Sequence, residues 1–141
     1  MDTPKHSVSV AGVVVNPAGQ VLVIRRRDNG HWEPPGGVLE LGESFDEGVR
    51  REVLAETGVK VTVDRLSGVY KNLHRGVVAL VFRCTPLNDP DGHSVEAADV
   101  RWADLAEVPR LMDPAYAVRI SDAFVEPTAV RVHDGVQLVD A

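Results

Sequence analysis

Short runs of aliphatic and β-branched residues alternate with turn-forming residues along most of this chain. Runs of this length and composition are typical of β-strands. They predict strands at residues 7–15, 21–27, 59–71 and 76–86. The first two are separated by Asn16–Gln20, which contains proline and glycine and predicts a hairpin turn.

The pattern changes to a helical spacing over residues 45–57, where Phe45, Val49 and Val53 fall on one apolar face. Ser44 and Glu47 are spaced as a capping box at the start of this helix. Gly58 follows its last residue, where a left-handed backbone conformation usually ends a helix.

A second helix is predicted at residues 113–125, with Asp113 as its N-cap and Pro114 in its first position. The tail at 128–141 alternates around Asp134-Gly135, which predicts a short hairpin, either an added sheet edge or a dimer element. Several strands with two separated helices indicate the α+β class.

Two glutamates of the first helix lie in an unexpected place. Glu52 and Glu56 are an i,i+4 pair of like charge, and they fall beside the apolar face. Carboxylates crowded there resist ionisation unless a cation lies between them, and a hard divalent ion with oxygen ligands suits such a pair. The alternative is an ordinary solvated acidic face, which would be expected opposite the apolar residues.

The spacing around these glutamates also resembles a known family. From Gly37 the chain has five residues, then Glu43, then seven residues, and then the segment REVLAETGV at residues 51–59. This pattern resembles the Nudix box of the Nudix hydrolases. It departs at Ala55, where the first of two adjacent glutamates is expected.

The resemblance implies an α/β/α sandwich with a mixed β-sheet between helices. It also implies hydrolysis of the pyrophosphate linkage of a nucleoside diphosphate joined to another moiety, with Mg²⁺ as cofactor and Mn²⁺ as a possible substitute. Glu52 and Glu56 would be the principal metal ligands and Glu52 would also orient or deprotonate water. The Gly37 carbonyl would add a ligand, and Glu43 would pair with Arg51 to brace the loop.

The same resemblance implies candidate site residues outside the box. Glu96 precedes an Arg-Trp pair, as does an acidic residue near the family's active site, and is a candidate ligand or general base; the alternative is a plain loop residue. Arg25 and Arg27 end the second strand, and one of these side chains is expected to contact substrate phosphate unless both are simply solvated.

Length and composition narrow the remaining choices. The chain has 141 residues and a net charge of −6, which fits one soluble domain over residues 1–141 and makes stable nucleic-acid binding unexpected. No apolar run is long enough to cross a membrane, so no membrane association is expected. A single cysteine and the lack of a signal-peptide pattern favour the cytoplasm. A homodimer is left open.

Two other functions are compatible with the motif. The missing glutamate at Ala55 would suit a catalytically weak, Nudix-like sensor that binds a nucleotide. An isomerase acting on an isoprenoid diphosphate would share the metal box, but the chain lacks a second cysteine for that chemistry. Metal-dependent phosphate release would separate an enzyme from a sensor.

Overall fold

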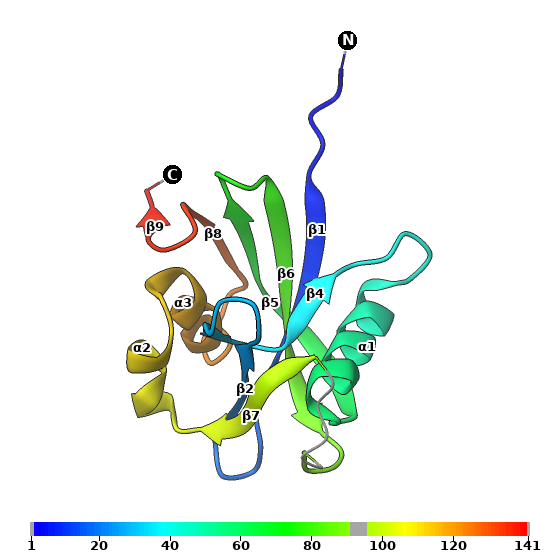
Figure 1. Ribbon diagram of the computed structural model, residues 1–141, viewed down its shortest axis with the longest axis vertical. Helices are drawn as coiled ribbons and strands as arrows, with labels where there is room; N and C mark the ends of the chain where they lie inside the picture. The colour runs from blue at the N-terminus through cyan, green and yellow to red at the C-terminus, as the bar shows by residue number, and fades with distance from the viewer. Residues whose placement is uncertain (1, 91–95, 141) are drawn as a thin grey trace.

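The computed structural model describes residues 2–90 and 96–140. It contains a six-stranded mixed sheet in the order β4-β1-β6-β5-β8-β9 and a three-stranded sheet in the order β3-β2-β7. Helix α1 covers one face of the larger sheet, and α2 and α3 lie on the opposite side (Figure 1). The predicted α+β class and α/β/α arrangement are therefore confirmed.

The elements follow one another along the chain with short connections. They are β1 (Ser7–Val14), β2 (Val21–Arg26), β3 (Trp32–Glu33), β4 (Gly36–Val38), α1 (Phe45–Thr57), β5 (Val61–Asn72), β6 (Val77–Pro86), β7 (Ala97–Ala103), the 3₁₀ helix η1 (Leu105–Glu107), α2 (Val108–Leu111), α3 (Pro114–Asp122), β8 (Ala129–His133) and β9 (Leu138–Val139). Among the described residues, no helix combines the length and apolar character needed to cross a bilayer.

Alternate residues of β1 face two separate cores. Val10 and Val14 pack with Val49 and Val53 of α1. Ala11 and Val13, together with Val15 just past the end of the strand, belong to a second core, which is completed by residues of α2 and α3 such as Val108 and Ile120. Both faces of β1 are thus buried, which explains why its sequence is almost continuously apolar.

Residues 7–15 and 21–27 are predicted to form a hairpin. The turn between them forms, but the prediction that the two strands pair with each other is wrong. Gly19 donates to the carbonyl of Asn16 in the turn, but only one bridge, between Val15 and Val21, joins the two segments. β1 instead pairs in parallel with β6 along its full length, while β2 joins the smaller sheet. Turn chemistry is local, whereas the strand partners are chosen by distant residues.

Helix α1 begins and ends as predicted. Ser44 accepts a hydrogen bond from the backbone N–H of Glu47 at 3.2 Å, and its own hydroxyl donates to the Glu47 carboxylate at 3.1 Å. Gly58 has φ of 74° and donates its N–H to the carbonyl of Leu54. The helix that carries the two glutamates is therefore fixed at both ends by its own sequence.

Helix α3 ends at Asp122, earlier than the predicted residue 125. The carbonyl of Ala123 accepts from the guanidinium groups of Arg65 at 2.8 Å and Arg83 at 2.9 Å, distant strand residues that a local pattern does not reveal. At the C-terminal end, β8 pairs in parallel with β5 and antiparallel with β9, extending the larger sheet.

Candidate metal centre and substrate cleft

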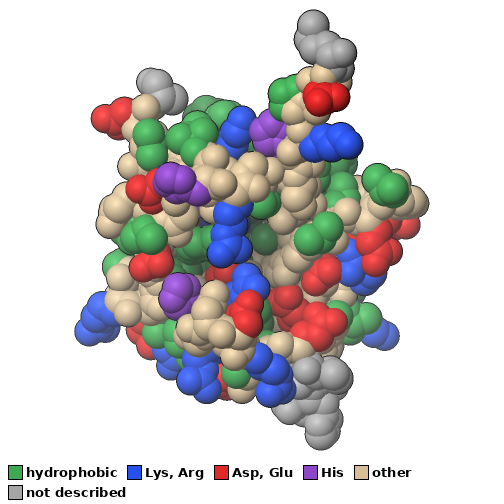
Figure 2. Space-filling model, turned by 45° about the horizontal axis from the view of Figure 1, so that its top comes forward, with side chains coloured by type: hydrophobic (Ala, Val, Ile, Leu, Met, Phe, Trp, Pro, Cys, Tyr) green, Lys and Arg blue, Asp and Glu red, His purple; other side chains and the backbone are tan. Residues whose placement is uncertain are grey.

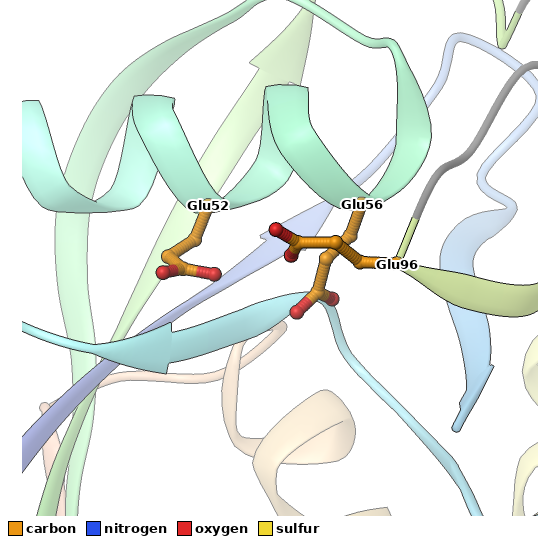
Figure 3. A group of neighbouring side chains, drawn as sticks. All are labelled: Glu52, Glu56 and Glu96. Carbon is orange, nitrogen blue, oxygen red and sulfur yellow. The ribbon is translucent and has the colours of Figure 1, made fainter. Parts of the chain in front are cut away.

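Three carboxylates meet between α1 and β7. Glu52 and Glu56 project from successive turns of α1, and Glu96 immediately precedes β7; the three point toward a common space (Figure 3). Each offers an oxygen, and these oxygens all lie within 4.8 Å of one another. We call these residues the acidic cluster. Helical spacing supplies two members, and the pairing of β7 with β2 delivers the third.

Glu56 is the most enclosed member of the acidic cluster, with 8% of the residue exposed. Burial raises the pKa of its carboxyl to about 8, and the charges of Glu52, Glu33 and Glu96 act in the same direction. Its Oε2 accepts a hydrogen bond of 3.3 Å from the backbone N–H of Gly36, which opposes this rise. A cation beside Glu56 would favour its ionised form.

Glu52 lies directly against β4. A Cβ atom placed on Gly37 would be 2.6 Å from both the Cδ and the Oε2 of Glu52, so a side chain here would displace that carboxylate. Gly37 pairs with Val10 in the ladder between β4 and β1. The glycine therefore allows the Glu52 carboxylate to rest on the strand backbone.

Arg51 connects the preceding loop to the helix. Its Nε and Nη2 donate to the two oxygens of Glu43 at 2.9 and 2.6 Å, and its Nη1 donates to Glu52 at 2.5 Å. Arg51 also donates to the carbonyl of Val38. The guanidinium holds the pKa of Glu43 at about 2, so Glu43 stays ionised and paired. Arg51 thus fixes one side of Glu52.

The acidic cluster opens into a cleft of about 540 Å³. Acidic and basic side chains lie next to each other on the face shown in Figure 2. Arg26 and Arg27 from the end of β2 line the cleft, together with Glu52, Glu56 and Glu96. A second cleft of about 620 Å³ shares Arg26 with the first.

The two predicted phosphate-binding arginines are placed differently. Arg27 is exposed and lines the cleft, and its contact with a substrate phosphate stays a prediction. Arg25 is not among the residues that line either cleft, and its guanidinium lies 6.0 Å from the ring centroid of Trp32. Arg26, which also lines the cleft, is bound to Asp28 at 2.7 Å. Of these three arginines, only Arg27 both lines the cleft and forms no ion pair among the described residues.

Ala55, where the box pattern has a glutamate, is exposed on α1, and the acidic cluster takes Glu52 and Glu56 from this helix. Glu33, from outside the box, lines the same cleft and adds its negative field to that of Glu56. Burial raises the pKa of Glu33, and Arg26 lies 3.5 Å from it. Glu33 is thus an additional acid of the site, although it stands in no recognisable spacing.

Other cleft residues also escape prediction from the sequence. Tyr116 and Arg119 come from α3, and His133 comes from the end of β8. All three are distant in the chain from the box and carry no motif. Only the packing of α3 and β8 against the sheet brings these side chains to the cleft.

Comparison with known proteins agrees with this geometry. The family model described as the NUDIX domain matches residues 5–124. The chain is 54% identical to a MutT-like protein of Streptomyces ambofaciens, covering 98% of this chain and 90% of that protein. It is 30% identical to a putative 8-oxo-dGTP diphosphatase of Bacillus subtilis strain 168, covering 78% and 74% of the two chains.

The fold is also found among solved structures. A NUDIX hydrolase from Nitrosomonas europaea superposes with a TM-score of 0.78 and 23% identity, covering 94% of this chain and 82% of the other. At that identity, the likeness concerns the fold alone.

Proposed function

This chain belongs to the Nudix hydrolase family, and we propose that it hydrolyses the pyrophosphate linkage of a nucleoside diphosphate joined to another moiety, using a divalent cation. The observation that carries this proposal is the acidic cluster. Its oxygens lie within 4.8 Å of one another, two of its members stand at box positions, and it opens into a cleft.

The residues of the acidic cluster fit a hard divalent cation. All three offer carboxylate oxygens, which Mg²⁺ and Mn²⁺ prefer. No Lys or Arg in the described chain forms an ion pair with Glu56 or Glu96, so their charge is available to a cation. A bound cation would neutralise charge on the pyrophosphate and acidify water. We favour Mg²⁺, with Mn²⁺ as a substitute.

The side chains take distinct roles in this proposal. Glu56 and Glu52 would hold the cation, and Gly37, which packs against Glu52, would add its carbonyl oxygen as a ligand. Glu96, exposed at the mouth, accepts a proton from the attacking water or completes the ligand set. Arg27 meets a phosphate, while Glu43 and Arg51 brace the loop and keep Glu52 in place.

The substrate class is a small nucleotide. The cleft volume of about 540 Å³ lies within the range of small-ligand sites. A relative named as a putative 8-oxo-dGTP diphosphatase supports a nucleoside polyphosphate. The net charge of −6 does not favour a polynucleotide partner.

A nucleotide sensor is the second candidate, because Ala55 removes a carboxylate from the box. A sensor would bind nucleotides without turning them over. The retained acidic cluster favours the hydrolase, since a sensor has no need for three converging carboxylates at the end of its cleft.

The test is phosphate and nucleotide release from a panel of nucleoside triphosphates and nucleotide sugars, with Mg²⁺, with Mn²⁺ and with a chelator. We expect metal-dependent release that Glu56→Gln abolishes. Glu47→Gln is the matched control, because Glu47 lies on the same helix at its exposed cap and glutamine also serves a capping box. Binding without turnover across the panel would favour the sensor.

A further inference from the structure

Arg119 is a buried arginine without a carboxylate partner in the part of the chain that the structure describes. Only 8% of the residue is exposed. Its guanidinium lies between two rings, 5.1 Å from the centroid of Tyr70 and 4.6 Å from that of Tyr116. By contrast, the arginines that form ion pairs have side chains between 35% and 41% exposed.

The nearest polar neighbour of Arg119 offers it no acceptor. Nη2 of Arg119 lies 3.3 Å from Nε2 of His133. Nδ1 of His133 accepts a hydrogen bond of 3.0 Å from the backbone N–H of Gly135. Burial and the charge of Arg119 lower the pKa of His133, so the ring is neutral and carries its proton on Nε2. Two donors therefore face each other.

A second donor of Arg119 also lacks an acceptor. Nε is buried and has no hydrogen-bond partner among residues 2–90 and 96–140. The charge of Glu33 acts to raise the pKa of Arg119, but the ion pair of Glu33 is with Arg26, at 3.5 Å. A buried cation with unsatisfied donors destabilises a fold strongly when its partner is missing. An acceptor from outside the protein would satisfy these donors.

Arg119 and His133 line the cleft that contains the acidic cluster. The strands of the larger sheet separate them from that cluster. The acidic cluster rests on β4, and His133 belongs to β8. The strand order places β1, β6 and β5 between them. A ligand group at Arg119 is therefore a different part of the substrate from the pyrophosphate at the acidic cluster.

The surroundings of Arg119 are rich in donors. Asn72, which pairs with His133 across β5 and β8, uses its Oδ1 to accept from the backbone N–H groups of His74 and Arg75. Its amide nitrogen is left as a further donor on the cleft wall. A site lined by donors selects a ligand edge that carries acceptor oxygens.

We propose that Arg119 is a specificity-determining residue that donates to the carbonyl oxygen of a keto base in the substrate. A planar guanidinium pairs well with such an edge and poorly with the amino group of adenine or cytosine, which is itself a donor. This inference rests on the proposed function, since it assigns the part of the same nucleotide that lies beyond the pyrophosphate.

The test compares two non-hydrolysable ligands, the α,β-methylene diphosphates of inosine and adenosine, by calorimetry in the presence of Mg²⁺. Their bases differ in carrying an oxo or an amino group at C6. We expect the unmodified protein to bind the inosine compound about tenfold more tightly, and Arg119→Met to remove this preference. Methylenediphosphonate, which has no base, should bind both proteins equally.

The matched control is Arg131→Met. Arg131 pairs with Asp122 at 2.7 Å and does not line the cleft, so this variant should melt at a lower temperature and keep the preference. Arg119→Met should melt no lower than the unmodified protein, because it removes an unpaired buried charge. Should it fail to fold, Arg119→Lys keeps the charge without the planar fork and should lose the preference.

Three results would overturn the inference. The first is equal affinity of the unmodified protein for the two nucleotide analogues. The second is an unchanged preference in a folded Arg119→Met protein. The third is a loss of methylenediphosphonate binding in Arg119→Met as large as its loss of inosine-analogue binding, which would make Arg119 a phosphate contact. Hydrolysis of a nucleotide by the unmodified protein is measured alongside. Its absence would count against the proposed function, whereas hydrolysis without base preference would count against this inference alone.

Discussion

A Cβ atom on Gly37 would lie 2.6 Å from the Cδ of Glu52, so strand β4 and helix α1 touch where the box glycine meets the box glutamate. The two residues are far apart in the motif, but they are in contact in the fold, and only a glycine at position 37 leaves space for the Glu52 carboxylate in its present position. Gly37 sets the position of the carboxylate, and Arg51 fixes its other side at 2.5 Å.

Gly37→Ala should therefore displace the Glu52 carboxylate while leaving the cores intact. We expect kcat/KM to fall by about a hundredfold or more, since a misplacement of about 1 Å at a reacting centre has that effect. The control is Gly42→Ala, because a Cβ on Gly42 meets no atom within 4 Å. Full activity of a folded Gly37→Ala protein would show that the position of Glu52 is not critical.

Stability in the absence of cations should depend on the ionisation of Glu56. Burial raises the pKa of its carboxyl from an ordinary 4.5 to about 8, so the folded state keeps a proton that the unfolded chain has lost between these values. The free energy of unfolding should therefore fall as pH rises through this window, and its full contribution is present below pH 4.5.

Thermal melting with a chelator from pH 5 to pH 9 measures this slope. Glu56→Gln should flatten most of this fall. Glu33, whose pKa burial also raises, adds a smaller fall, whereas His133, whose pKa burial lowers from 6.5, adds a rise at the acidic end of the range. Glu43, with a pKa of about 2, changes stability only at lower pH. A slope identical in the variant and the unmodified protein would refute the assignment to Glu56.

Glu96 is the member of the acidic cluster that lies outside the box, so its role can be tested separately from those of Glu52 and Glu56. Glu96→Gln should lower kcat by about a hundredfold if it takes a proton in the transition state, with a smaller change in KM. Asp99→Asn, which alters an exposed acid on the strand that follows Glu96, should leave both unchanged. An unaltered kcat and pH–rate profile for Glu96→Gln would exclude the catalytic role.

Ala55 leaves the site short of one negative charge, which should weaken cation binding to the free protein. A diphosphate analogue should strengthen that binding through reciprocal linkage, because its oxygens supply further ligands. Calorimetric Mg²⁺ titrations of the unmodified protein and Ala55→Glu, with and without methylenediphosphonate, measure both effects. Ala55→Glu should bind Mg²⁺ more tightly without the analogue. Tight binding of several ions by the free unmodified protein would contradict a reduced site.

The sequence predicts those features that depend on neighbouring residues. Ser44, Glu47 and Gly58 fix both ends of α1, and the helical spacing of Glu52 and Glu56 places them together. Glu96 was found only through the family resemblance, because no local pattern links it to a helix forty residues earlier in the chain.

Other features depend on long-range pairing and could not be predicted. The turn at Asn16–Gln20 forms as its residues indicate, yet β6 takes the place of β2 beside β1. The contact between Arg119 and His133 also depends on residues that are distant in the chain. Each is an ordinary residue in its own segment, and their donor-to-donor contact arises only when α3 packs beside β8.

The central claim is that the divalent cation that hydrolysis requires binds at the acidic cluster of Glu52, Glu56 and Glu96, with the first two as its principal ligands. It is tested most directly by anomalous diffraction from crystals grown with Mn²⁺ and a non-hydrolysable nucleotide. The account predicts a strong anomalous peak among these three carboxylates and its loss in Glu56→Gln crystals. An active protein whose Mn²⁺ peak lies elsewhere, with none at the acidic cluster, would contradict it.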